Sequence, residues 1–390
     1  MAKTKRPATF AIPTTTRPYN ALLVSVLAVA SAAALWLMRI EPPMKGVPVD
    51  FVERVEARTY PDGTAMRTHY TGIKAVDEGV LFLIAAFAAG PLGWDNGVRL
   101  QQLHFIVQFA AVIVAWNVEA CRARNSWKLI SFTWFFALFY QTVGGAVIIP
   151  LYYVAHVLSS SSDAHHVSGR RVSLPHAKSL LLSVAIGYLI PSLAMYIPFL
   201  SASSREFLLF LWQPAPIFVN VLLFLFSEVF ATAEPRGVKN RNPDVPHLKR
   251  LYALTGVVCT VNQLVTLYVC ATAGGIGDPK LGFAYVFLPD RDLMARTTTA
   301  GLHYIFQIDW WGCFVPTLFW AWISVADCHR LLLGNSVSAA QLVKWALYIL
   351  GLSLALGPGG MLAVVWSWRE DRLVMIEAGV RGTVEKPKME

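Results

Sequence analysis

The sequence predicts an all-α fold, a polytopic bundle of eight or nine transmembrane helices forming a single domain over residues 20–368. Of the 390 residues, 55% are hydrophobic and 15% are charged, whereas a soluble domain carries about a quarter charged residues. Apolar runs long enough to cross a bilayer as helices recur along the whole chain. The net charge of +9 is spread over termini and loops, so basic groups at the membrane surface explain it and no nucleic-acid partner is expected.

The first helix is expected at residues 21–38, after a basic, Thr- and Pro-rich segment, 1–19, that we expect to be disordered. A small-residue stretch beginning at Ser31 resembles a signal-peptide cleavage region. The apolar run continues to Met38, however, so an uncleaved helix is predicted. The following segment, 40–74, contains several prolines and is too long for a simple connection, so it is expected to lie outside the membrane and to cap a cavity.

The next three helices are expected at 77–92, 103–120 and 129–157. The last of these is longer than one bilayer crossing and contains Pro150, so it should kink or emerge at one side.

Two proline-interrupted runs, 179–200 and 207–231, predict the fifth and sixth helices, and this region leaves the helix count open. The remaining runs lie at 251–273, 301–325 and 342–368. The last of them is interrupted at Gly357-Pro-Gly-Gly and is followed by a polar tail over residues 369–390. The basic residues of the loops do not fix the orientation in the membrane.

The most informative residue is Asp309, a single carboxylate inside an aromatic, apolar run beside Trp310-Trp311. Hydrocarbon makes an ionised carboxylate costly, so this group should be neutral, paired or beside trapped water. Aromatic rings stabilise positive charge. A neutral acid in a ring-lined cavity could therefore start carbocation chemistry on an apolar substrate. A structural Asp that is hydrogen-bonded to a neighbouring helix explains the same pattern.

Three other carboxylates are candidate acids. Glu78 follows Asp77 at the start of the second run, where a helix N-terminus also favours acidic residues. Glu119 lies near Arg122, so a surface ion pair is the alternative. Glu228 lies among phenylalanines in the sixth run, and we expect it to be the next most buried carboxylate after Asp309.

Helical spacing places Phe306, Asp309 and Trp320 on one face of the eighth run. The residues expected to form a substrate pocket that stabilises a cation are Tyr140, Gln141, Phe306, Trp310 and Trp320. For Gln141, a hydrogen bond between helices is the alternative.

Several motifs are absent from the sequence. It has no DDxxD or NDxxD pair for a magnesium–diphosphate site and no histidine boxes of a di-iron desaturase. Its five cysteines form neither a disulfide framework nor a CxxC metal site. No glycine-rich phosphate loop supports ATP-driven transport.

The helix start at Asp77-Glu78 and the stretches 140–145 and 307–311 give the chain a family resemblance. It resembles the fungal integral-membrane terpene cyclases of ascochlorin-, ascofuranone- and macrophorin-type meroterpenoid pathways. This resemblance implies a multi-pass enzyme of the endoplasmic reticulum that works in secondary metabolism. It would protonate a terminal epoxide or olefin of a lipophilic, prenylated aromatic precursor taken from the lipid bilayer and guide its cyclisation, with no metal and no organic cofactor. The acid would be kept neutral by desolvation.

Two other classes of protein remain open. A multipass transporter or receptor without catalytic activity could use its intramembrane acids to bind a proton or a ligand. A membrane acyltransferase could use His104 or His303 as its base, although both histidines could equally be hydrogen-bonded structural residues.

Overall fold

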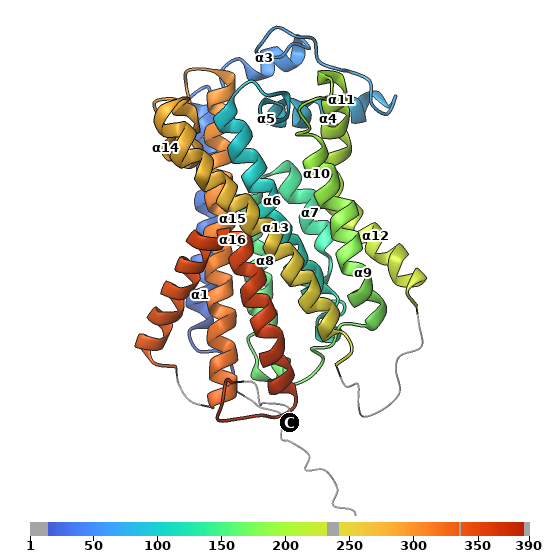
Figure 1. Cartoon of the computed structure of the whole chain (residues 1–390), viewed down its shortest axis with the longest axis vertical. Helices are drawn as coiled ribbons and strands as arrows, with labels where there is room; N and C mark the ends of the chain where they lie inside the picture. Colours follow the sequence, from blue (N-terminus) through green and yellow to red (C-terminus); the bar gives the residue numbers. More distant parts are fainter. Residues whose placement is uncertain (1–14, 232–241, 335–336, 386–390) are drawn as a thin grey trace, which may run out of the picture.

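The computed structural model describes residues 15–231, 242–334 and 337–385. Over these residues the chain is all-α, with isolated β-bridges and no strand. The prediction of the fold class is confirmed. The helices run roughly along the long axis of the molecule, with short helices gathered at one end (Figure 1).

The first half of the chain forms α1 (Asn20–Leu35), the π-helix η1 (Trp36–Ile40), α2 (Glu41–Met44), α3 (Phe51–Glu56), α4 (Lys74–Phe87), α5 (Ala89–Leu92), α6 (Asn96–Ala120), α7 (Thr133–Thr142), α8 (Gly145–Ser159) and the 3-10 helix η4 (Asp163–His166). The second half forms α9 (Leu174–Val184), the π-helix η5 (Ala185–Leu189), α10 (Ile190–Ala194), α11 (Ala202–Trp212), α12 (Ala215–Val229), α13 (Val245–Ile276), α14 (Phe283–Phe287), α15 (Thr298–Leu333) and α16 (Ala339–Glu377). Short 3-10 turns lie at Ala123–Asn125, Leu129–Ser131 and Pro279–Leu281.

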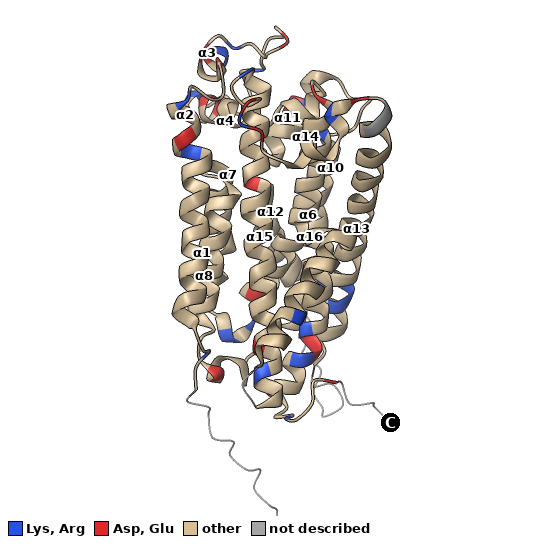
Figure 2. Ribbon diagram, turned by 90° about the vertical axis from the view of Figure 1, so that its left-hand side faces the viewer, with Lys and Arg blue, Asp and Glu red and all other residues tan. Residues whose placement is uncertain are grey.

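Five helical stretches of the described chain are long and apolar enough to cross a membrane, or six if the bent pair of α11 and α12 is one span. The five are Asn20–Met44, Asn96–Ala120, Leu174–Ala194, Val245–Gly274 and Ala339–Glu377. Alongside them, α15 is 36 residues long and packs against α16 and α8. The expectation of eight or nine transmembrane helices is matched only roughly. Charged side chains gather toward the two ends of the bundle, as the hydrocarbon region requires (Figure 2).

The middle of the bundle is α6, which packs against α9, α13, α15 and α16 (Figure 1). Nearly all of its side chains are buried, including several amides. These amides bond to neighbouring helices: Gln101 donates to the carbonyl of Phe306 at 3.1 Å, and Gln108 to that of Cys259 at 2.7 Å. Such bonds between helices hold together a core that a membrane cannot assemble by hydrophobicity alone.

The predicted fourth helix breaks at a glycine pair rather than at its proline. Here α7 ends at Thr142 and α8 starts at Gly145, whereas Pro150 lies inside α8. Gly144 has φ +117°, a backbone conformation that a side chain would disfavour. The break therefore lies where glycine permits it, and it places the start of α8 inside the bundle.

The folded bundle includes residues from both segments that were expected to be tails. The last helix, α16, continues to Glu377 and so includes the first residues of the polar segment 369–390. Arg369 and Glu370 are buried and carry ion pairs, which extends the folded bundle past the apolar run. At the other end, Arg17 is buried and pairs with Asp327 at 2.6 Å, while residues 1–14 of the predicted disordered tail lie outside the described residues.

Candidate active site

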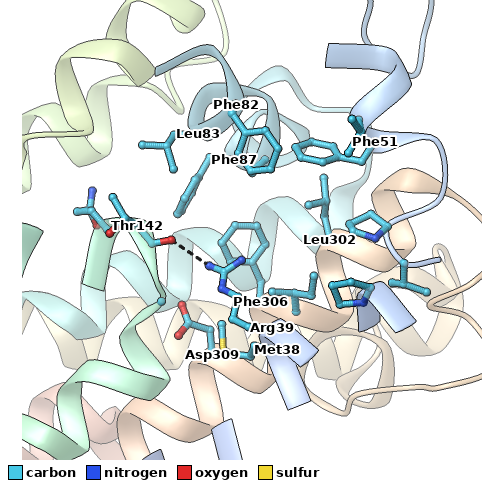
Figure 3. Close-up of a pocket in the computed structure, with 18 of the residues that line it drawn as sticks. Met38, Arg39, Phe51, Phe82, Leu83, Phe87, Thr142, Leu302, Phe306 and Asp309 are labelled. Atoms are coloured by element: carbon cyan, nitrogen blue, oxygen red, sulfur yellow. Dashed lines mark hydrogen bonds between the residues drawn. The ribbon is translucent and has the colours of Figure 1, made fainter. Parts of the chain in front are cut away.

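A cavity of about 420 Å³ lies between the capping segment and the helices beneath it. Residues 43–53 form its roof, and its walls come from η1, α4, the end of α7 and α15. The close-up in Figure 3 shows these side chains converging from segments far apart in the sequence. The expectation that the segment 40–74 caps a cavity is confirmed.

The cap is fixed to the bundle by one buried carboxylate. The hydroxyl of Tyr60 donates to Glu206 on α11 at 2.5 Å, and the backbone N–H of Arg67 donates to the same oxygen at 3.2 Å. Burial, with this carboxylate beside it, raises the pKa of Tyr60 well above its ordinary value. The phenol therefore stays protonated and keeps its hydrogen bond at any physiological pH.

Asp309 lies on the inner wall of this cavity, with 8% of the residue exposed. Its Oδ1 accepts a hydrogen bond from the backbone N–H of Ala146 at 2.6 Å, and the thiol of Cys313 lies 3.8 Å from the same oxygen. Ala146 belongs to the first turn of α8, and the positive end of a helix favours a carboxylate. Neither of these two bonds uses Oδ2.

This contact requires a glycine at the start of α8. A Cβ added at Gly145 would lie 2.5 Å from the Cys313 sulfur, closer than side-chain carbons approach, and 3.3 Å from Asp309 Oδ1, which is a tight contact. The absence of a side chain at Gly145 therefore lets the end of α8 reach the carboxylate. The acid is placed by backbone geometry as well as by its own helix.

Aromatic rings form part of the cavity wall, which also includes the charged residues Asp50 and Glu53. Phe87 packs edge-on against Phe306 at 4.7 Å between ring centroids, and Phe51 against Phe82 at 4.9 Å. A second hollow of about 50 Å³ also contacts Asp309. Its aromatic lining comprises Phe87, Phe105, Phe109, Tyr140, Tyr188 and Trp212. The acid thus has ring-lined space on two sides, which suits an intermediate with delocalised positive charge.

Three of the five predicted pocket residues, Tyr140, Gln141 and Phe306, line the cavity with Asp309. The Gln141 amide also donates to the carbonyl of Gln213 at 2.7 Å, the hydrogen bond between helices considered as its alternative role.

The two tryptophans do not line this cavity. Trp310 donates to His104 at 3.1 Å. Trp320 is fully buried between Tyr153 and Trp366.

Glu119 is not near the cavity. It is fully buried at the opposite end of the bundle, where it accepts from Arg122 at 2.9 Å and from Arg369 at 2.7 Å. The alternative of a surface ion pair was therefore right about the pairing and wrong about the surface. A carboxylate fixed by two guanidinium groups is a poor proton donor, because it is held in its ionised form.

Glu78 and Glu228 are both exposed. Glu78 is 49% exposed at its side chain and lies 3.9 Å from Arg58 on the cap, while its neighbour Asp77 is buried and accepts from Thr71 at 2.7 Å. Glu228 lies on the last turn of α12, whose end faces outward. The expectation of deep burial for Glu228 is wrong, because α12 ends on the surface of the bundle.

The two histidines proposed as bases are hydrogen-bonded structural residues. His104 bonds to the side chain of Gln263 at 2.7 Å, and His303 to the carbonyl of Tyr285 at 2.8 Å. Neither of them lines the cavity with Asp309.

Arg39 was not singled out from the sequence. It lies on η1 and lines the cavity. Its Nε donates to the carbonyl of Val143 at 2.6 Å, and its Nη2 to that of Thr142 at 3.4 Å. A π-helical turn next to a cavity is a usable sign of a functional position, but it is visible only in the structure.

The chain was compared with known proteins. A terpene cyclase, ascI of Acremonium egyptiacum, is 23% identical over 328 residues, which cover 80% of this chain and 82% of that protein. A second terpene cyclase, rstn5 of Aspergillus nomiae, is 28% identical over 341 residues, 84% of this chain and 90% of that protein. The FAD-dependent monooxygenase verC1 of Penicillium polonicum is 26% identical over 280 residues, but these are only 32% of its length. No solved structure matches the chain.

A model of one protein family covers nearly the whole bundle. The CtvD domain matches residues 21–375, from the first transmembrane helix to the end of the last. Together with the relatives named terpene cyclase, this match confirms the resemblance to fungal membrane terpene cyclases. The chain belongs to the CtvD domain family.

Proposed function

We propose that this chain is a membrane-bound terpene cyclase that protonates the terminal epoxide of a prenylated aromatic precursor and guides its carbocation cyclisation. The observation that carries the proposal is Asp309, a carboxyl group on the inner wall of an aromatic-lined cavity. General acids of this kind combine desolvation with a direct path to the substrate.

The cyclase activity is supported by the family and by its named members. The relatives that match this chain over most of their own length are named terpene cyclases, and the CtvD domain spans the same region. A role in secondary metabolism follows from this. The long apolar helices support a multi-pass membrane location, and we place the enzyme in the endoplasmic reticulum.

The domain content of other relatives favours an epoxide over an olefin as the substrate. Three relatives named FAD-dependent monooxygenases match this chain over about a third of their own length. Such proteins hold a segment like this one in the same chain as an oxygenase. An oxygenase can convert a terminal olefin to an epoxide, which would be the substrate of the next step.

The reaction needs from the protein a proton donor, a group that stabilises the carboxylate left behind, and groups that stabilise the cation. Asp309 gives its proton to the epoxide oxygen, the bond from that oxygen to the more substituted carbon breaks, and the neighbouring double bonds attack the cation in turn. The last cation loses a proton, so the product is an isomer of the substrate. The carboxylate left behind is stabilised by the N–H of Ala146, and the ring faces of Phe87 and Phe306 stabilise the passing charge.

The substrate class follows from the setting. A prenylated aromatic compound partitions into the bilayer, and a cavity of about 420 Å³ would enclose its prenyl chain. The apolar side chains of the wall would keep water away from the cation. The lipid bilayer and the lipophilic substrate are therefore the partners we propose.

Microsomes from a host expressing the chain would test this function. They would be supplied with farnesylated phenols and with the terminal epoxides of the same phenols. A cyclic product of unchanged mass from the epoxide supports the proposal. Uptake without chemical change would instead identify the transporter or receptor considered from the sequence.

A further inference from the structure

Arg39 is a charged group near the end of the candidate membrane span Asn20–Met44 that the proposed mechanism does not yet use. Ionisable residues within membrane-spanning segments are rare and are commonly functional. In Figure 3 its guanidinium extends toward Thr142 and lies beside Asp309 and Met38. Its two bonds to the last carbonyls of α7 fix the guanidinium in place at the cavity wall.

Arg39 and Asp309 face the same small region beside Gly144. A Cβ placed on Gly144 would lie 3.6 Å from Arg39 Nη2 and 3.7 Å from Asp309 Oδ1. The methyl group of Met38 would lie 2.8 Å from the same point. The cation and the acid therefore border a shared space, and a flexible methionine occupies part of it.

The two groups are nevertheless separate. Among the ion pairs of the described residues, none joins Arg39 to Asp309. The guanidinium is tied to α7, and Asp309 to the first turn of α8. A direct ion pair would hold the carboxylate ionised and prevent it from acting as an acid. Because they are separate, both side chains remain available to contact a substrate.

We propose that Arg39 donates a hydrogen bond to the same epoxide oxygen that Asp309 protonates. This inference rests on the proposed function and makes it more specific. Negative charge grows on the epoxide oxygen as its carbon–oxygen bond breaks, and a fixed N–H donor stabilises that charge. The proton comes from Asp309, the oxygen becomes the hydroxyl of the product, and Arg39 keeps all of its protons.

The inference also separates the two possible substrates. An olefin is protonated on carbon and offers no oxygen to a guanidinium. An epoxide offers one oxygen that both groups can contact. A requirement for Arg39 in the chemical step therefore identifies the epoxide as the substrate.

A structural role for Arg39 makes a different prediction. A cation at the carbonyl end of α7 stabilises that helix. Loss of this role would lower the amount of folded protein and the melting temperature. It would leave kcat per folded molecule unchanged.

The test compares Arg39→Lys, Arg39→Met and Arg39→Ala in microsomes, with the terminal epoxide of a farnesylated phenol as substrate. We expect kcat of Arg39→Met to fall roughly 10- to 100-fold, the range of one hydrogen bond to a charged group. Arg39→Lys should lie between this variant and the wild type. Added guanidinium chloride at millimolar concentration should restore part of the activity of Arg39→Ala. The matched control is Arg58→Met, an exposed cation on the cap that does not line the cavity.

Several results would overturn the inference. A wild-type kcat in Arg39→Met would do so, as would losses that follow the melting temperature and are not rescued by guanidinium. If Arg39→Met does not accumulate in membranes, the kcat of Arg39→Lys decides, and a wild-type value there refutes the inference. An active Asp309→Asn would instead count against the proposed acid. Turnover of the olefin but not of the epoxide would remove the role of Arg39 and leave the cyclase standing.

Discussion

Replacing Asp309 by Asn isolates the acidic proton. The amide has nearly the same shape, and its oxygen can still accept the bond from the Ala146 N–H that the structure shows at 2.6 Å. The cavity and the bundle should therefore be unchanged. The change removes a proton that can be given to the substrate, because an amide is a far weaker acid than a carboxylic acid.

The expected loss in Asp309→Asn is at least a few hundredfold in the rate of cyclisation. That is about 3.5 kcal/mol of transition-state stabilisation and lies within the ~100- to 10,000-fold range of general acid catalysis. The assay is the rate of cyclic product formation in microsomes, normalised to the amount of enzyme in the membrane. That amount should stay near the wild-type level, because a neutral amide is no harder to bury than a protonated acid.

Glu228→Gln provides the matched comparison, since its carboxylate is exposed at the end of α12. We expect this variant to form product at the wild-type rate. Near-wild-type turnover in Asp309→Asn, or a large loss in Glu228→Gln alone, would refute the assignment of the acid. Either result would show that position at the cavity is a poor guide to the proton donor.

Three further variants test the surroundings of the site. Gly145→Ala puts a methyl group against Cys313 and Asp309, so we expect product formation to fall at least tenfold and stability to fall by about 1–3 kcal/mol; unchanged activity would mean that α8 does not position the acid. Glu119→Gln leaves the buried Arg369 without its carboxylate partner and Arg122 with only Glu370, so thermal unfolding should show a loss of about 3–5 kcal/mol while kcat per folded molecule stays constant; a specific loss of kcat would return Glu119 to the list of acids. His166, on η4 outside the membrane-spanning helices, has its pKa lowered by burial first and by nearby arginines second. The unfolded chain takes up the proton below about pH 6.5, so stability should fall from there downward by at most about 1.4 kcal/mol per pH unit. Melting curves at pH 7.5 and 5.5 should show a smaller difference in His166→Gln than in the wild type, and an equal difference would assign the pH effect to other groups.

The sequence predicts the location of Asp309 well because the relevant signal is local. A carboxylate flanked by aromatic and apolar residues must be placed away from lipid, and only the bundle interior offers such a place. Tyr140 and Phe306 reach the same cavity, one through the end of α7 and the other through the face of α15 that carries Asp309. The capping role of the segment 40–74 also follows from its length and its prolines.

The sequence ranks the remaining carboxylates incorrectly because burial depends on tertiary packing. Glu228 has apolar neighbours in sequence, but α12 turns those neighbours to the surface. Glu119 has arginines close by in sequence and gains another, Arg369, from the far end of the chain. The sequence around a residue shows its neighbours along the chain, but not the neighbours that the fold brings to it. Arg39 was missed for the same reason, since its partners Thr142 and Val143 are about a hundred residues away.

The break between α7 and α8 explains why an acid and a cation can stand so near each other unpaired. The carbonyl end of α7 is the negative end of a helix, and it holds Arg39. The amide end of α8 is the positive end of the next helix, and it holds Asp309. Each side chain is thus hydrogen-bonded to backbone rather than to the other side chain. A continuous helix would offer neither end. If the break were closed, we expect Arg39 and Asp309 to form an ion pair, and Asp309 would then be held ionised and could not donate a proton.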